Sequence, residues 1–203
     1  MGGVWIPLHP ALAIFWHTTF PLEIQHQVML TNNPLRVINN SQLELARAIA
    51  NDAVLLHSAP QPPWALLTSC DNMVAMSWMR KGVVTMDGPV AMLLHLHVNI
   101  AQANQFQSHY VHIPGEENEI ADLCSPAFHL TDMELLSFLN LCYPLQESWQ
   151  QCHLPSMIKL WLTSTLSLMT LHWASWLPEL DLDIFFGSSG CTSARASKLT
   201  LSL

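Results

Sequence analysis

Residues 112–122 read His-Ile-Pro-Gly-Glu-Glu-Asn-Glu-Ile-Ala-Asp and form the most distinctive segment of this 203-residue chain. They continue an extended run, 108–113, whose side chains alternate in the manner of a strand and which Pro114-Gly115 ends. A short helix is expected over 118–124. Asp122 therefore lies in a late helix that follows directly after a strand. A carboxylate buried at such a position would require a structural or functional explanation.

Two other acids stand at comparable positions upstream. Asp71 follows the compact apolar run 64–69, which is typical of a buried strand, and a short helix is expected from there to about Arg80. Glu44 lies in the first turn of a helix that is expected to begin at Ser41. The letters Ser-Gln-Leu-Glu over 41–44 have the form of a capping box, and an apolar stripe at helical spacing follows them.

Each of these three acids has an ordinary explanation when taken alone. Glu44 can serve as a cap partner, Asp71 can cap the helix that follows it, and Asp122 can be a solvated surface acid. Together they indicate a more specific arrangement, because a strand end, a crossing helix and a late helix can converge on one point. Clustered carboxylates repel one another unless a divalent cation neutralises them. Two Mg²⁺ ions about 4 Å apart are the usual device for in-line attack on a phosphodiester.

The rest of the N-terminal pattern predicts an α/β fold. Short apolar runs over 3–6 and 13–20, separated by prolines, indicate a hairpin. Pro89 opens a longer helix. The expected elements along the whole segment are, in order, strands, a helix, a strand, helices, a strand and a helix. This is the order of an α/β domain.

Composition limits the functions that the chain can have. Fifteen Asp and Glu against seven Lys and Arg give a net charge of −8, which argues against a broadly basic surface for binding phosphates. Five cysteines with no C-x-x-C pair, and a start without the basic region of a signal peptide, indicate reduced thiols and an intracellular protein, cytoplasmic or nuclear. The uncharged stretch 160–177 is long enough to span a bilayer, but its many Ser and Thr residues argue against a membrane role.

Four segments resemble the ribonuclease H domains of retrotransposon (reverse transcriptase) polyproteins. Residues 39–46 are similar to the start of the helix that carries the family's Glu, and residues 69–72 to the strand end that carries its Asp. The letters Met-Ser-Trp over 76–78, with Lys81-Gly82, are similar to the helix that comes next. Residues 112–122 are similar to the H-I-P-G-x-x-N-x-x-A-D segment that closes the family's domain.

This resemblance implies a ribonuclease H-like three-layer fold around a central mixed sheet, followed by a mainly helical or irregular C-terminal extension. It implies that Glu44, Asp71 and Asp122 bind metal, two Mg²⁺ in an intact site, and that the RNA strand of an RNA–DNA hybrid is hydrolysed. It assigns His112 to proton transfer or product departure, and Asn118 to shaping the same loop. The implied partners are nucleic acid and the neighbouring reverse transcriptase and integrase-type domains of a polyprotein.

The chain also departs from the family pattern. The family's first Asp lies on the opening strand, a few residues before a glycine-rich turn that resembles Gly2-Gly3-Val4-Trp5, and no Asp or Glu precedes Glu23 here. We therefore expect an N-terminally truncated domain with an incomplete first strand. Because that carboxylate normally bridges both ions, we also expect the nuclease to be weak or inactive.

The expected organisation is a ribonuclease H-like domain over 1–126, a helical connecting region over 127–184 and a flexible tail over 185–203. A helix is expected over 130–141, with Thr131 or Asp132 near its cap. Two alternatives stay open. One is a non-catalytic interaction module that keeps the fold, favoured by eight tryptophans, and the other is a protein attached to a membrane through 160–177.

Overall fold

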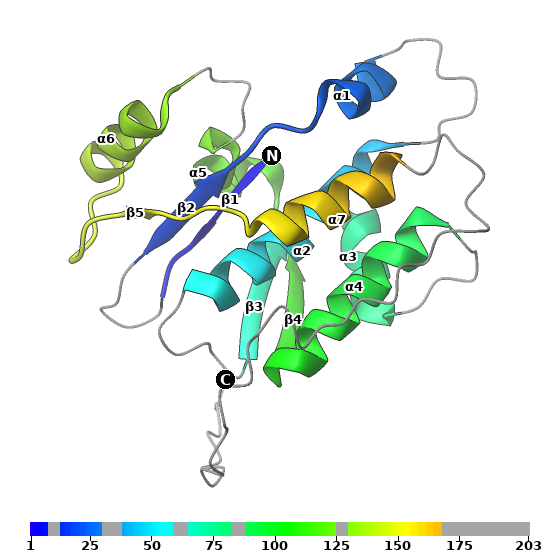
Figure 1. The fold of residues 1–203 in the computed structure, drawn as a ribbon. Helices are drawn as coiled ribbons and strands as arrows, with labels where there is room; N and C mark the ends of the chain where they lie inside the picture. Colours follow the sequence, from blue (N-terminus) through cyan, green and yellow to red (C-terminus); the bar gives the residue numbers. More distant parts are fainter. Residues whose placement is uncertain (8–12, 30–37, 59–64, 83–87, 125–129, 168–203) are drawn as a thin grey trace, which may run out of the picture.

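The computed structural model describes residues 1–7, 13–29, 38–58, 65–82, 88–124 and 130–167 (Figure 1). Strands and helices alternate in a mixed α/β fold, as the sequence predicts. The strands are β1 (Gly2–Trp5), β2 (Ile14–His17), β3 (Ala65–Cys70), β4 (Gln107–His112) and β5 (Gln150–Gln151). The helices are α1 (Leu22–Met29), α2 (Asn40–Ser58), α3 (Met73–Lys81), α4 (Pro89–Asn104), the short 3₁₀ turn η1 (Gly115–Glu117), α5 (Glu119–Leu123), α6 (Asp132–Cys142) and α7 (Ser156–Ser167).

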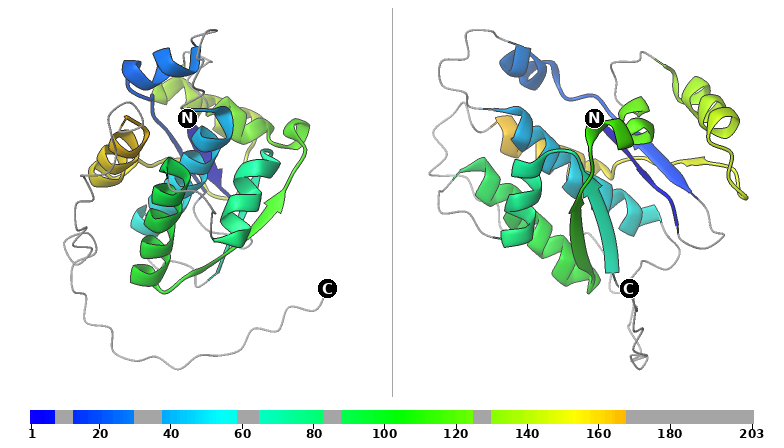
Figure 2. Two further views of the ribbon diagram at one scale, coloured as in Figure 1. Left: turned by 90° about the vertical axis from the view of Figure 1, so that its right-hand side faces the viewer. Right: turned by 180° about the vertical axis from the view of Figure 1, so that it is seen from behind.

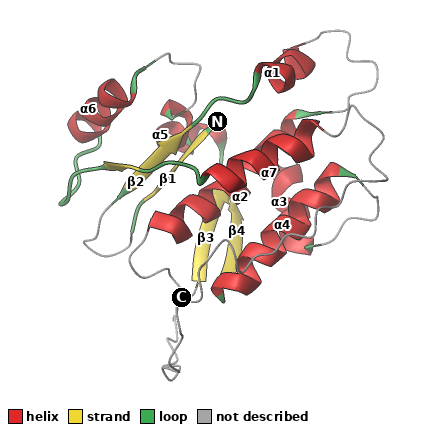
Figure 3. Ribbon diagram, viewed as in Figure 1, coloured by secondary structure: helices red, strands yellow, loops and turns green. Residues whose placement is uncertain are grey.

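The described strands form two sheets rather than the single central sheet that was expected. β1 pairs antiparallel with β2, and β2 pairs parallel with β5, so the first sheet is mixed. β3 and β4 form a separate parallel pair. Figure 3 shows the two groups of strands in yellow, with β1 and β3 as the members nearest to each other. The expected hairpin of 3–6 and 13–20 is confirmed in the β1–β2 pair.

Helix α2 joins the two sheets because it packs against both β1 and β3. Its apolar stripe is fully buried at Leu45, Ile49 and Val54. α2, α4 and α7 lie on one side of the strands, which is the near side in Figure 1 and the far side in the right-hand view of Figure 2. On the other side of the β3–β4 pair, Leu67 is 72% exposed.

A buried polar network fixes the β3–β4 pair against α2 and α4. The carboxylate of Asp52, on α2, accepts hydrogen bonds from Thr68 Oγ1 at 3.0 Å and from Ser108 Oγ at 3.3 Å. His97 Nε2, on α4, lies 3.3 Å from the same carboxylate and 2.6 Å from the hydroxyl of Tyr110. A carboxylate that is only 1% exposed is thus supplied with partners from three elements, as a buried charge requires.

The cap of α2 differs from the expected one, and the difference bears on Glu44. The helix begins one residue earlier, at Asn40, and the capping pair lies two residues earlier: Gln42 N donates to Asn39 Oδ1 at 3.0 Å and Asn39 N donates to Gln42 Oε1 at 2.8 Å. The expected box of Ser41 and Glu44 is therefore wrong, because Asn39 and Gln42 have the same spacing and satisfy the first N–H groups. Glu44 has no capping role.

Asp71 is likewise not a cap. The side chain of Asn72 caps α3 instead, since its Oδ1 accepts from Val74 N at 3.1 Å and from Ala75 N at 2.9 Å. Gly82 ends the same helix with φ of 63°, a conformation that glycine adopts without strain.

The C-terminal part of the described chain packs onto this core. Ile158, Leu162 and Leu166 of α7 are buried in the same apolar cluster as α2 and α4, and Trp161 packs against its edge. Helix α6, expected over 130–141, begins with a capping box between Thr131 and Glu134.

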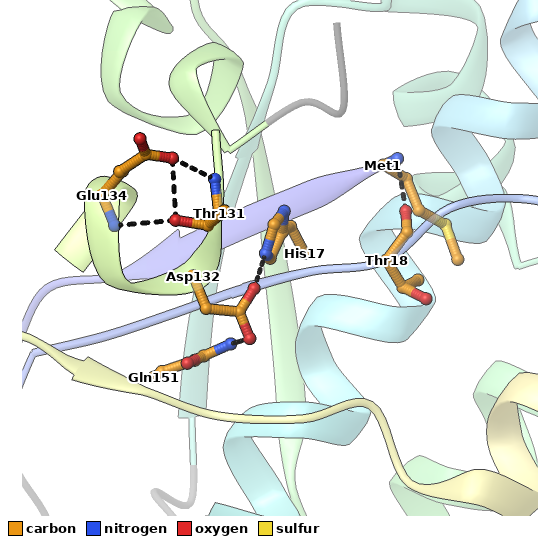
Figure 4. Close-up of polar contacts among 7 residues, drawn as sticks. All are labelled: Met1, His17, Thr18, Thr131, Asp132, Glu134 and Gln151. Atoms are coloured by element: carbon orange, nitrogen blue, oxygen red, sulfur yellow. Dashed lines mark hydrogen bonds and ion pairs between the residues drawn. The ribbon is translucent and has the colours of Figure 1, made fainter. Parts of the chain in front are cut away.

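One carboxylate joins α6 to two strands. The carboxylate of Asp132 accepts from His17 on β2 at 2.5 Å and from Gln151 on β5 (Figure 4). These two hydrogen bonds, with Gln151 first, hold the pKa of Asp132 below its usual range.

Nothing in the described part of the chain has the form of a membrane span. None of its helices is both long enough and apolar enough to cross a bilayer. Residues 168–177 of the stretch considered for this role, together with Trp173, Trp176 and the expected tail over 185–203, lie outside the described residues.

The capping assignment predicts which of two adjacent side chains stabilises α3. Asn72→Ala removes the acceptor for two helix N–H groups and should lower the free energy of unfolding by about 1 kcal/mol. Asp71→Asn, the matched control, should leave it unchanged or raise it, because Asp71 caps nothing and its charge repels Glu44. Urea denaturation measures both. A loss in Asp71→Asn equal to that in Asn72→Ala would contradict the assignment.

Candidate functional site

Two of the three predicted acids come together directly. Ligand atoms of Glu44, Asp71 and the intervening Cys70 all lie within 4.8 Å of one another. Glu44 extends from near the start of α2, just after its first turn, while Cys70 and Asp71 stand at the carboxyl end of β3. Since α2 packs across β3, the N-terminal part of the helix lies near the end of the strand and brings the two carboxylates together.

Asp122 is joined to this cluster through the guanidinium of Arg47, which also pairs with Glu44. Arg47 Nη1 lies 3.5 Å from Glu44 Oε2 and 3.7 Å from Asp122 Oδ1, so the two carboxylates flank one guanidinium nitrogen. Asn118 Nδ2 donates to Asp122 Oδ1 at 3.3 Å. Because the side chain of Asn118 is buried and that of Asp122 is 48% exposed, Asn118 orients the more exposed of the two. Asp122 thus borders the cluster of Glu44 and Asp71 without belonging to its closest group.

Arg47 is the residue that the sequence reasoning did not single out for the site. Its Nε donates to Gly2 O at 2.5 Å and its Nη2 donates to Ala121 O at 2.9 Å. The guanidinium therefore joins β1, α2 and α5, and its Nη1 remains directed at the two carboxylates. Its three-residue spacing from Glu44 on a helix was the signal available in the sequence.

The segment 112–122 surrounds Asp71, as its position after β4 requires. His112 Nε2 lies 3.2 Å from the backbone carbonyl oxygen of Asp71; because a carbonyl only accepts, this nitrogen carries the proton. The imidazole is exposed to solvent. A Cβ added at Gly115 would stand 3.8 Å from Asp71 Oδ2, so the turn after Pro114 lies against the carboxylate.

Burial and repulsion between the acids raise the pKa of two carboxylates, those of Glu44 and Asp122. Burial is the largest cause that raises the pKa of Glu44, with Asp71 and Asp122 adding to it and Arg47 opposing it. The pKa of Asp122 is also raised, first by partial burial, against the attraction of Arg47. The guanidinium thus does not fully compensate Glu44 and Asp122, and the negative charge of the cluster would stabilise a bound cation.

The donor set fits a hard divalent cation better than a soft one. Carboxylate oxygens are the ligands that Mg²⁺ prefers. The thiol of Cys70 adds a soft donor, but burial raises its pKa, so it stays protonated at neutral pH and is a poor ligand in that form. Glu44 and Asp71 would then hold the cation, and Asp122 would have to turn away from Arg47 to join them.

The predicted site residues therefore occupy one region of the molecule. Glu44 and Asp71 are in direct proximity, Asp122 lies across Arg47, His112 stands at the exposed rim, and Asn118 holds Asp122. Comparison with protein-family models, with curated proteins and with solved structures finds no match for this chain.

The raised pKa of Glu44 gives a pH-dependent prediction. A carboxyl group whose pKa is raised by folding favours the native state only when protonated, so its contribution is lost as the pH rises through the folded pKa. Glu44→Gln should therefore be more stable than the wild type at pH 7, and the difference should shrink as the pH is lowered toward 4.

Urea denaturation at several pH values tests this expectation. Glu147→Gln, which alters an exposed acid, serves as the matched control and should be as stable as the wild type at both pH 7 and pH 4. A Glu44→Gln protein that is less stable than the wild type at pH 7 would mean that the ion pair with Arg47 outweighs the cost of burying the charge.

Proposed function

We propose that this chain is a retrotransposon-derived ribonuclease H-like nuclease domain, in which Glu44, Asp71 and Asp122 hold Mg²⁺ beside the RNA strand of an RNA–DNA hybrid. The observation that supports the proposal most strongly is the convergence of three acids that are distant in the sequence. They come from the positions that the resemblance assigns to metal ligands: a helix start, a strand end and a late helix. The contacts of His112 and Gly115 with Asp71 add the most specific motif to the same place.

Several residues of the chain would have distinct roles in such a site. Glu44 and Asp71 would bind the cation with their carboxylate oxygens, and Asn118 would limit the rotation of Asp122. The exposed imidazole of His112 stands where it can accept or release a proton next to the bound phosphate. Mg²⁺, when bound, would supply charge neutralisation at the phosphoryl oxygens and a more acidic bound water.

Two features of these residues would make such an enzyme weak. Pairing of two ions in the family uses a fourth carboxylate, and residues 1–22 contain no Asp or Glu. Arg47, in addition, would compete with a cation for Glu44 and Asp122. Because its Nε and Nη2 are fixed to backbone carbonyls, Arg47 cannot move away as a whole when a cation arrives.

The small number of described basic side chains also implies weak binding of nucleic acid. Among the described residues up to 124, the basic side chains of Lys and Arg are Arg47, Arg80 and Lys81. Arg80 donates through Nε and Nη2 to the carbonyl oxygen of Tyr110, at 2.9 and 2.7 Å. Lys81 is exposed and available to a phosphate. Such a surface would give a low affinity with little dependence on salt.

A second candidate function is a non-catalytic interaction module that retains the fold. The observation that favours it is the ion pairing of Arg47, which already gives Glu44 and Asp122 a partner without any metal. In this reading the acids and Arg47 serve only to join α2, β1 and α5.

Magnesium binding and hybrid cleavage separate the two candidates. Calorimetric titration should show Mg²⁺ binding to the wild type, and Asp71→Asn should abolish it, whereas Glu147→Gln should bind as the wild type does. Cleavage of a labelled RNA–DNA hybrid should be slow or absent with the chain as given. It should appear when a strand bearing an Asp is added ahead of Met1, and should fall by at least about 100-fold when Glu44→Gln is combined with that addition.

The outcomes of this experiment are distinct. Cleavage in the extended protein that Glu44→Gln removes supports the nuclease. If Mg²⁺ does not bind and neither protein cleaves the hybrid, the nuclease proposal is wrong and the interaction module is favoured.

A further inference from the structure

Helix α5, which carries Asp122, is too short to hold its own position. It has five residues, and isolated helices shorter than about 12 residues are marginally stable in water. The place of α5 in the fold therefore depends on its contacts with other elements. Arg47 supplies one of them, because its Nη2 donates to the carbonyl oxygen of Ala121 at 2.9 Å.

The apolar side of α5 packs on a second apolar cluster, which is separate from the main core around α2. Ile120 and Leu123 of α5 pack against this second cluster, and Cys124, directly after the helix, is fully buried in it. α5 and α6 lie together beside β1 and β2, away from α4 (Figure 1). The buried members of the second cluster are Ala13, Phe15, Cys124, Leu135, Leu139 and Trp149. Half of them come from beyond residue 130, so α5 rests on the C-terminal part of the chain.

Polar contacts add to this apolar packing. The side chain of Tyr143, directly after α6, is hydrogen-bonded to that of Glu119, the first residue of α5. The carbonyl oxygen of Tyr143 accepts from Trp149 Nε1 at 2.8 Å, and the backbone N–H of Trp149 donates to Asn140 Oδ1 at 3.1 Å. Because both of its N–H groups have fixed partners, the buried ring of Trp149 is held in one orientation within the second cluster.

The segment 131–151 is fastened to the first sheet at both of its ends. At the start of α6, the carboxylate of Asp132 accepts from His17 on β2 and from Gln151 on β5 (Figure 4). At the other end, β5 pairs with β2, and Gln150 N donates to Ala13 O at 2.9 Å. These contacts keep the buried side chains of α6 in place against the second cluster.

On its other side, α5 lies directly against the backbone of β1. A Cβ added at Gly2 would stand 2.2 Å from the carbonyl oxygen of Cys124 and 2.7 Å from its Cβ, so there is no space between the end of α5 and the strand. α5 is therefore held between β1, Arg47 and the second cluster. Asp122 Oδ1 lies 3.7 Å from Arg47 Nη1, and a displacement of α5 would change this distance directly.

We propose that residues 131–151 form a clamp that positions Asp122, because they hold α5 against β1 and so keep this carboxylate beside Glu44 and Arg47. The inference rests on the proposed function, in which the three acids bind a cation. Leu139 and Trp149 are then positioning residues, which contact neither the cation nor a substrate and act through α5. The part of the chain that forms the site thus extends to at least residue 151, beyond residue 126, where the resemblance to the family ends.

Two matched leucine truncations test the clamp. Leu139→Ala removes a fully buried side chain of α6 from the second cluster, and Leu162→Ala removes an equally buried one of α7 from the main core. Both should destabilise the protein, but only Leu139→Ala should loosen α5. Hydrogen exchange measured by NMR reports this, since Asp122 N donates to Asn118 O. Relative to the amides of β3, the α5 amides should exchange at least about tenfold faster in Leu139→Ala and at an unchanged ratio in Leu162→Ala.

Magnesium binding is the second measurement. If the wild type binds Mg²⁺, Leu139→Ala should bind it at least about tenfold more weakly, whereas Leu162→Ala should bind it as the wild type does. Equal binding by the wild type and a folded Leu139→Ala protein would overturn the clamp and leave the proposed function intact. A wild type that binds no Mg²⁺ would contradict the proposed function, and hydrogen exchange would then decide on the clamp alone.

The exchange experiment has two results that would overturn the proposal. One is an unchanged rate for the α5 amides in a folded Leu139→Ala protein, and the other is an equal acceleration of these amides in both variants. If Leu139→Ala does not fold, Leu139→Val removes only one methylene group from the same place. It should accelerate the α5 amides selectively but to a smaller extent, and exchange identical to that of the wild type would again overturn the proposal.

Discussion

The rest of the site depends on the hydrogen bonds and ion pairs of the Arg47 guanidinium. It donates to the backbone of β1 and of α5 and lies between the carboxylates of Glu44 and Asp122. A half-buried arginine with partners from three elements fixes their positions relative to one another, since each lost partner would leave part of the charge uncompensated. Asp122 thus joins the other two acids because Arg47 holds α5 and β1 against the start of α2.

The acids also border an open space. Glu44, Arg47 and Asp71 line a cavity of about 700 Å³ together with the residues of β1 and β3. The carboxylates of Glu44 and Asp71 can therefore be approached from this cavity.

Much of this fold could be predicted from local patterns, and the exceptions have physical reasons. The β1–β2 hairpin, α3 and α4 follow apolar periodicity and proline positions, which are local signals. The cap of α2 was misplaced because Asn39 with Gln42 and Ser41 with Glu44 offer the same spacing two residues apart. β5 has two residues and forms only through its pairing with β2, so nothing local specifies it. For the site, the convergence of Glu44 and Asp71 could be predicted, whereas the contacts of Arg47 with Gly2 and Ala121 join residues 45 and 74 positions apart and leave no local pattern.

Crystals soaked in Mn²⁺ would test the central claim most directly, because anomalous scattering locates this ion without reference to any activity. The account predicts a peak bound by the carboxylates of Glu44 and Asp71 that disappears in Asp71→Asn. Crystals that diffract well and show no such peak, with Arg47 still paired to Glu44 and Asp122, would contradict it.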